Sequence, residues 1–262
     1  MPTLAELVSG FDPTSEFVVP TQWTQGRTAY GGLTAAMSVL AAQLTKGKPL
    51  APLKSAQFLL SAPVVDSATF TARRLREGRS ASSVAVETVS GGQVAAHASL
   101  IFAQPRPSAI SHDHVGVPEV PAPEECAPFG DASAPLRPAF VDNIEMVQAG
   151  GTVPLANDGD PRFRAWVRHR GAEGVDPAVA LVALADALPP ATTAAFTEWA
   201  PVSTMSWSLH ICTDDLPKPT DWMLLESSST FTLDGYSHQS MTLWDSASRP
   251  IIQASQTVAL FA

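Results

Sequence analysis

The chain has 262 residues, of which 45% are hydrophobic and 16% charged, and its formal net charge at pH 7 is -9. This composition allows a sizeable buried core and excludes an intrinsically disordered chain. An acidic chain without a basic patch also argues against a nucleic-acid-binding protein, because such a surface needs Lys and Arg side chains to neutralise phosphates.

A buried helix is predicted over residues 30–44, after a short amphipathic start (residues 1–10) and a strand (residues 17–20). The stretch opens on Tyr30, Gly31 and Gly32 and is apolar or small on almost every face. A helix of this kind is surrounded by other elements rather than covered on one side. Paired glycines at its start allow close backbone approach and leave N–H groups that can hold a carbonyl or an anionic oxygen.

Strand-like runs follow this helix, and they are predicted to form an antiparallel meander around it. A Gly91-Gly92 pair is typical of a hairpin turn between the last two runs. The four runs span residues 55–60, 69–75, 82–90 and 93–102.

A proline-rich connector is predicted over residues 105–138. Prolines occupy eight of these positions, and proline at this density blocks both helices and strand ladders. We therefore predict two domains, residues 1–104 and residues 139–262, with the connector between them.

The second half repeats the pattern of the first. Asp176 and Pro177 are a strong start signal for a second apolar helix over residues 176–188. Strands are predicted before it at 140–148 and 162–168, and after it at 204–211, 222–232, 237–244 and 251–261. Gly78 and Gly235 occupy corresponding turns, so the chain is predicted to be an internal duplication.

These features predict an α+β fold in which two antiparallel sheets, one in each half, wrap around a buried helix. The arrangement and several segments resemble the type II acyl-CoA thioesterases and their relatives, which carry two hotdog folds in one chain. The matching segments are Tyr30-Gly31-Gly32, LREGRS (75–80), LADALP (184–189), Trp207 to His210, and Ala254-Ser255-Gln256. The resemblance covers nearly the whole chain except the connector.

The resemblance implies an enzyme that hydrolyses an acyl-CoA thioester to a free acid and CoA, without a cofactor. Family hydrolases use an Asp, a Thr and a Gln of the second hotdog to position water. Gln256 fits the glutamine and Thr230 the threonine, whereas Thr204 stands where we align the family aspartate. Asp186 is the nearest replacement for that carboxylate. Tyr30, Gly31 and Gly32 are then expected to bind the substrate, with backbone N–H groups at the helix start polarising the thioester carbonyl.

Two alternatives stay open at this point. Because position 204 is a threonine and not a carboxylate, the chain could be an acyl-CoA-binding or acyl-binding protein with lost or weak hydrolysis. If the family's site geometry is kept, restoring the carboxylate by Thr204→Asp is expected to raise thioesterase activity. Asp186 could equally lie in the last helical turn and face solvent or a backbone amide. Hydratase-type chemistry would need an Asp–His pair beside the helix, and the sequence does not indicate one.

The remaining predictions concern compartment and assembly. Cys126 and Cys212 have no metal-ligand spacing, and neither a signal peptide nor a run long enough to span a membrane is evident. A cytoplasmic protein without a metal or membrane association is expected. A double hotdog imitates the dimer of single hotdogs, so we predict a homodimer or a larger even homo-oligomer.

Overall fold

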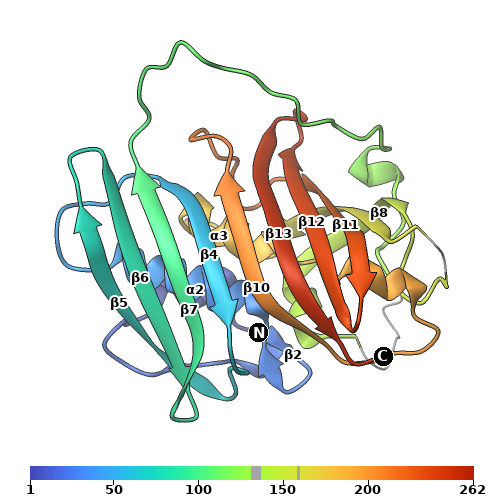
Figure 1. The fold of residues 1–262 in the computed structure, drawn as a ribbon, viewed down its shortest axis with the longest axis horizontal. Helices are drawn as coiled ribbons and strands as arrows, with labels where there is room; N and C mark the ends of the chain where they lie inside the picture. Colours follow the sequence, from blue (N-terminus) through green and yellow to red (C-terminus); the bar gives the residue numbers. More distant parts are fainter. Residues whose placement is uncertain (131–136, 158–159) are drawn as a thin grey trace.

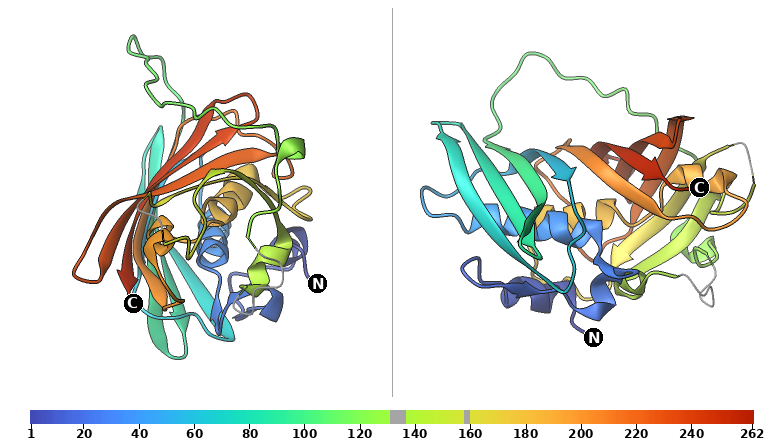
Figure 2. Two further views of the ribbon diagram at one scale, coloured as in Figure 1. Left: turned by 90° about the vertical axis from the view of Figure 1, so that its right-hand side faces the viewer. Right: turned by 60° about the horizontal axis from the view of Figure 1, so that its bottom comes forward.

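A single large antiparallel sheet, with two buried helices on one of its faces, forms the framework of the computed structural model (Figures 1 and 2). The structure describes residues 1–130, 137–157 and 160–262. The α-helices are α1 (Leu4–Ser9), α2 (Gly31–Gln43) and α3 (Pro177–Ala185), and the short 3-10 helices are η1 (Thr21–Trp23), η2 (Pro123–Glu125), η3 (Ala139–Asn143) and η4 (Ala191–Ala195). The strands are β1 (Phe17–Val18), β2 (Thr24–Gln25), β3 (Thr28–Ala29), β4 (Leu53–Leu60), β5 (Ser67–Glu77), β6 (Ala81–Ser90), β7 (Gln93–Ala103), β8 (Ile144–Gly151), β9 (Arg162–His169), β10 (Val202–Ile211), β11 (Met223–Leu233), β12 (Tyr236–Asp245) and β13 (Pro250–Leu260).

Both predicted helices are present, and their apolar composition matches their burial. Every residue from Gly32 to Ala42 in α2 is buried, as is every residue from Ala178 to Ala185 in α3. Asp176 caps α3 by accepting hydrogen bonds from two backbone N–H groups, as predicted. The second helix is shorter than expected, because it ends at Ala185 and leaves Asp186 as its C-cap.

The strand order reveals the internal duplication. It runs β1-β5-β6-β7-β4-β10-β13-β12-β11-β9-β8. Read outward from the centre, the first half is therefore β4-β7-β6-β5 and the second half β10-β13-β12-β11. Gly78 and Gly235 lie in the equivalent turns, between β5 and β6 and between β11 and β12.

The prediction of two separate sheets needs correction, because β4 and β10 pair with each other and join the halves into one sheet of eleven strands. At this seam Phe58 lies opposite Trp207, and their rings stack with centroids 5.4 Å apart. An unpaired strand edge leaves backbone N–H and C=O groups without partners, and pairing the two central edges satisfies both.

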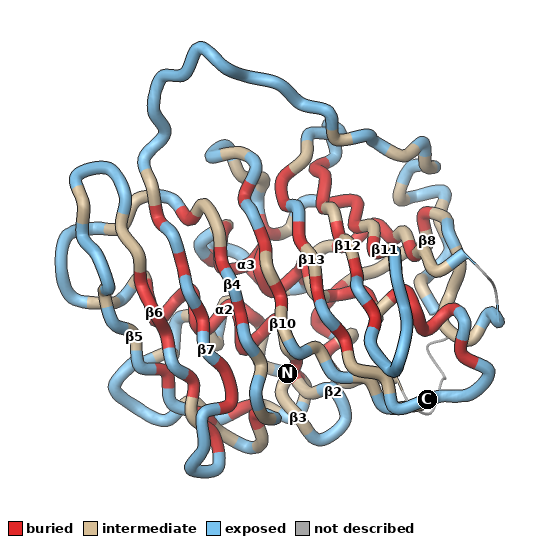
Figure 3. The backbone as a smooth tube through the Cα atoms, viewed as in Figure 1, coloured by how far each residue is buried: buried red, intermediate tan, exposed pale blue. Residues whose placement is uncertain are grey.

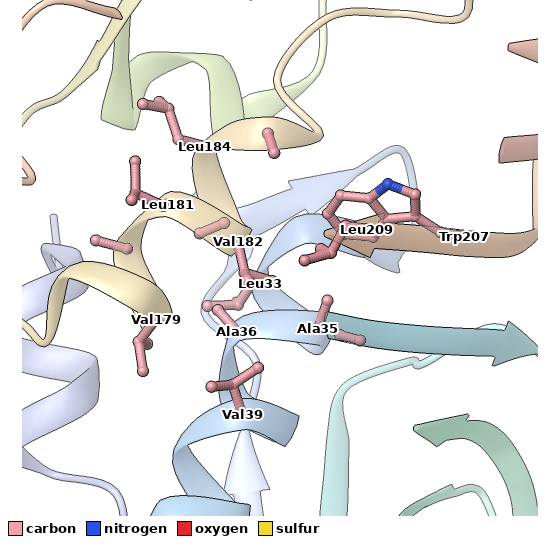
Figure 4. Packing of buried hydrophobic residues seen from close by; sticks show 14 of the residues in the cluster. Leu33, Ala35, Ala36, Val39, Val179, Leu181, Val182, Leu184, Trp207 and Leu209 are labelled. Carbon is pink, nitrogen blue, oxygen red and sulfur yellow. The ribbon is translucent and has the colours of Figure 1, made fainter. Parts of the chain in front are cut away.

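The two helices also contact each other on the inner face of this shared sheet, rather than each being enclosed separately (Figure 2). Figure 4 shows Leu33 and Ala36 of α2 beside Val182 of α3, with Leu209 of β10 to their right. All four belong to the same buried cluster. The main core is therefore shared by the two halves.

The proline-rich segment begins as an exposed loop, drawn at the top of Figure 3. Its later part packs against the second half of the chain. Its Pro121 carbonyl accepts a hydrogen bond from the Trp166 indole, at 2.9 Å. Phe129 donates its backbone N–H to Met146 of β8. Residues 131–136 of the predicted connector lie outside the described part of the chain.

The strand predicted over residues 140–148 begins later than expected, because residues 139–143 form η3 and β8 starts at Ile144. Within the described ranges, none of the helices combines the length and hydrophobicity that a membrane span requires.

Candidate active site

A cavity of about 610 Å³ lies beside the C-terminal end of α3. Strands β10 and β13 provide its polar side through Thr204 and Gln256, and the residue that ends α3, Asp186, joins them. Much of the remaining wall is apolar, with Phe140, Met146, Leu188 and Trp199 among its residues. Three of the four predicted catalytic side chains therefore meet in one cavity.

Asp186 and Gln256 form the central interaction of this site. The Gln256 Nε2 group donates a hydrogen bond to Asp186 Oδ1 at 2.7 Å, and the backbone N–H of Gly32 donates to the same carboxylate. Asp186 keeps a partly exposed surface, whereas Gln256 is 5% exposed. The prediction that Asp186 lies at the end of α3 is confirmed, but its carboxylate points toward the other helix and not into bulk solvent.

The start of α2 provides partners for a carboxylate at this largely buried place. Its N-cap, Tyr30, makes no side-chain capping bond, and the first N–H groups of a helix need acceptors. Asp186 supplies one from the other half of the chain, at the positive end of the α2 dipole. The two helices thus meet N-terminus to C-terminus through one charged side chain.

Glycine is required at the start of α2 because the helices approach so closely. A Cβ atom at Gly31 would lie 2.8 Å from Asp186 Oδ2, and one at Gly32 would lie 2.5 Å from the Ala183 carbonyl oxygen. Both distances are shorter than van der Waals contact. The paired glycines that the sequence indicated as a ligand site therefore serve the contact between the helices.

Burial raises the pKa of Asp186 from its ordinary value of 3.8 to about 6, against the opposing effect of the hydrogen bonds from Gln256 and the Gly32 N–H. A carboxylate with a pKa near 6 is deprotonated at neutral pH and is still basic enough to accept a proton from water. These are the properties of a general base.

Gln256 is held by the sheet, on β13 opposite Trp207 of β10 and Gln239 of β12. The sequence did not single out Gln239, which is fully buried and accepts a hydrogen bond from the backbone N–H of Ala191 at 2.9 Å. This bond fixes the start of η4, which forms part of the cavity wall. The sequence signal that could have revealed Gln239 is a second glutamine on the predicted strand next to that of Gln256, where both side chains face inward.

The two candidate threonines lie in different places. Thr204 lines the cavity, next to an irregularity in the β10–β13 register between Thr204 and Ser206. Thr230 is exposed on β11, and its hydroxyl pairs with His238 Nδ1 at 2.9 Å. The structure thus brings Thr204, and not Thr230, to the Asp186–Gln256 pair.

The residues predicted to bind substrate lie behind the carboxylate. Tyr30 is 1% exposed, and its hydroxyl donates to the Ala183 carbonyl oxygen at 2.6 Å. Its ring stacks on Phe140 at a centroid distance of 3.8 Å. Tyr30, Gly31 and Gly32 do not line the cavity, and the Gly32 N–H is occupied by Asp186. In the described ranges, no group of three His, Cys, Asp or Glu side chains is arranged to hold a metal ion.

Comparisons with known proteins agree with this architecture. A family model described as the acyl-CoA thioesterase N-terminal domain matches residues 19–103, and one described as the acyl-CoA thioesterase C-terminal domain matches residues 123–260. A search of curated proteins found no match.

Solved structures share the fold at low sequence identity. One is a hot dog fold protein of unknown function from Alicyclobacillus acidocaldarius, with a TM-score of 0.82 and 22% identity over 94% of this chain and 92% of that one. Another is the acyl-CoA thioesterase II TesB2 of Mycobacterium marinum, with a TM-score of 0.73 and 18% identity over 94% and 91%. These likenesses show that the chain has the hot dog fold.

Proposed function

The chain belongs to the acyl-CoA thioesterase family, and from this premise we propose that it hydrolyses an acyl-CoA thioester to the free acid and CoA. The observation that carries the proposal is the hydrogen-bonded Asp186–Gln256 pair in an otherwise largely apolar cavity. A base beside a donor is what activation of water requires, and apolar walls suit an acyl group.

In this mechanism Asp186 takes a proton from a water molecule as the water oxygen bonds to the thioester carbonyl carbon. The C–S bond of the resulting tetrahedral intermediate then breaks, and the departing thiolate receives the proton from Asp186. Gln256 fixes the orientation of the carboxylate, and the Thr204 hydroxyl hydrogen-bonds the water. Orientation of this kind contributes because the reacting groups are held near their attack geometry.

The catalytic roles proposed for Asp186, Thr204 and Thr230 differ from those that the alignment with the family implies. Asp186 fills the role of the family aspartate and Thr204 that of the threonine, whereas Thr230 has no part in the reaction. This reassignment removes the reason for expecting lost hydrolysis, because the site has its carboxylate.

The walls favour a neutral, apolar acyl group. Phe129, Phe140 and Trp199 contribute aromatic surface. Arg137 is the cation among the described lining residues, and it forms an ion pair with Asp142 at 2.6 Å. The ion pair reduces the ability of Arg137 to bind a second carboxylate on the acyl group.

The test is thiol release from a panel of acyl-CoA esters of varied chain length and branching. We expect wild-type protein to release thiol from at least one ester, and Asp186→Asn to abolish the release while the protein unfolds cooperatively. Tight binding of the esters without release would instead indicate an acyl-CoA-binding protein. Thiol release undiminished in Asp186→Asn would show that the site lies elsewhere.

We also propose a domain division and a location for the protein. The first is the division into domains 1–104 and 139–262 with the connector 105–138. The second is a cytoplasmic location, which the unpaired thiols of Cys126 and Cys212 favour.

A further inference from the structure

We propose that Tyr30 is a positioning residue: through its hydrogen bond to the last turn of α3, the N-terminal half of the chain fixes the base of a site that belongs to the C-terminal half. The inference rests on the proposed function only where it concerns turnover. The placement of Asp186 by Tyr30 can be measured without a substrate.

The bond from Tyr30 replaces one that α3 lacks. In a continuing helix the Ala183 carbonyl would accept from the N–H of Ala187, but that group donates to Leu184 at 3.0 Å. The Tyr30 hydroxyl donates to the Ala183 carbonyl oxygen instead, at 2.6 Å and in a fully buried setting. Without it a buried carbonyl would lose its partner, and the last turn that leads to Asp186 would be free to move.

The position of Tyr30 is itself strongly constrained. Its ring is nearly parallel to that of Phe140, at an interplanar angle of 5°, and Phe140 lies in η3 and lines the cavity. Its backbone N–H donates to Trp23 at 2.9 Å. Tyr30 thus connects the cavity wall, the start of α2 and the end of α3.

The glycines beside Tyr30 complete the constraint. The Gly32 N–H holds the carboxylate from one side. The missing Cβ of Gly31 leaves the space that Asp186 Oδ2 occupies, because a Cβ there would be 2.8 Å away. Tyr30, Gly31 and Gly32 therefore act as one unit that sets where the base lies.

The opposite end of the helix pair shows that this coupling is specific. There Asp176 caps its own helix through the N–H groups of Ala178 and Val179, and Gln43 of α2 reaches it only through an exposed bond of 3.2 Å. The local cap needs no help from the other half. Only the end that carries Asp186 uses a cap from the partner helix.

Two other titratable or charged groups of the described chain bear on Asp186, one that interacts with it and one that lines the same cavity. One is Tyr30 itself, whose pKa is raised by burial and by the Asp186 charge, so its hydroxyl stays a neutral donor. The other is Arg137, which lines the cavity and is paired with Asp142. Loss of the Gly32 contact removes a hydrogen bond that favours the charged carboxylate, so displacement of Asp186 within its buried surroundings raises its proton affinity.

The experiment compares Tyr30→Phe with Tyr236→Phe. Both substitutions remove one hydroxyl, but Tyr236 is exposed, and the sequence contains no third tyrosine. Gly31→Ala is the second variant, because it pushes the carboxylate away without touching Tyr30. The Asp186 carboxyl is titrated by 13C NMR, with its signal assigned by comparison with Asp186→Asn, and kcat and KM are measured in parallel.

We expect Tyr30→Phe and Gly31→Ala to move the Asp186 titration midpoint to higher pH, with Tyr236→Phe unchanged. In turnover, kcat should fall by about tenfold or more with KM changed less than about twofold, because a small misplacement of a catalytic group is costly. An unchanged midpoint in folded Tyr30→Phe overturns the proposal. A shifted midpoint in a protein whose wild type releases no thiol supports the positioning role and overturns the proposed hydrolysis.

Discussion

At the scale of single residues, the protonation of Asp186 links activity to stability. The folded chain raises this pKa to about 6 from 3.8, so between these values the folded state binds more protons than the unfolded state. The free energy of unfolding therefore falls as the pH rises through this window. A difference of this size corresponds to about 3 kcal/mol, and at neutral pH the folded chain is less stable by about this amount because the largely buried carboxylate is charged.

The first prediction is that Asp186→Asn removes this pH dependence. The variant should be more stable than wild type at pH 8 and show a smaller advantage, or none, at pH 4, while its hydrolysis is lost. Urea unfolding at the two pH values measures the change. Asp142→Asn, at a carboxylate with a half-exposed side chain, is the control and should follow wild type. A variant less stable than wild type at pH 8 would contradict the assigned pKa.

The second prediction concerns the hydrogen bond from Gln256. Gln256→Ala should lower kcat by roughly one to three powers of ten, because the carboxylate loses its fixed orientation. Gln253→Ala is the matched control, since it lies on the same strand with an exposed side chain. Steady-state kinetics on an ester that wild type hydrolyses decides the matter. Equal effects of the two substitutions would show that Gln256 acts only through the strand.

The third prediction reverses an expectation drawn from the sequence. Thr204 lines the same cavity as Asp186, so Thr204→Asp would place a second carboxylate near the first. Two such groups cannot both be charged easily, and one pKa rises. Activity at pH 7 should therefore fall and its acid limb should move to higher pH. A pH–rate profile with increased activity at pH 7 would restore the original alignment.

At the scale of elements, the two helices could be predicted from the sequence, but the contact between them could not. Continuous apolar character defined α2 and α3 because burial on all sides leaves that signature in the sequence. The bond between Tyr30 and Ala183 joins residues 153 positions apart, and no local pattern records it. For the same reason the sequence indicates a ligand site at Gly31 and Gly32, although the structure gives them a steric role.

The sheet shows the same limit. Alternation and turns predicted most of its strands, but pairing of β4 with β10 depends on which edges remain open after both halves fold. The family resemblance places Thr230 in the site, whereas the fold exposes that end of β11. The sequence indicates Asp186 and Gln256 as site residues, whereas only the folded chain shows that they contact each other.

The fourth prediction belongs to the contact between α2 and α3. Alanine normally stabilises a helix relative to glycine, but a Cβ at Gly32 would meet the Ala183 oxygen at 2.5 Å and the Tyr30 ring at 2.6 Å. Gly32→Ala should therefore destabilise the protein by about 1–3 kcal/mol through overpacking. Gly116→Ala, where nothing lies within 4 Å, is the control. Urea unfolding with no loss for Gly32→Ala would mean that the helices separate easily.

At the scale of the whole molecule, duplication has produced two similar halves and one site. Gln256 on β13 faces Trp207 across the ladder, and the equivalent pair in the first half is Ala98 opposite Phe58. The first half thus lacks the glutamine and contributes a helix start instead. The two halves are specialised, one carrying the polar side chains and the other their support.

The last prediction concerns assembly. The outer face of the central strands bears apolar side chains that the described residues leave uncovered: Leu59 on β4 is 57% exposed and Ile101 on β7 is 40% exposed. Pairing of this face with its copy about a two-fold axis would bury both, and closed two-fold contacts are the commonest in homo-oligomers. Light scattering at micromolar concentration should give at least twice the 27.6 kDa of one chain, and Leu59→Lys should shift the mass toward a single chain. A mass of 27.6 kDa for wild type would contradict the dimer, and an unchanged oligomer in Leu59→Lys would place its interface on another face.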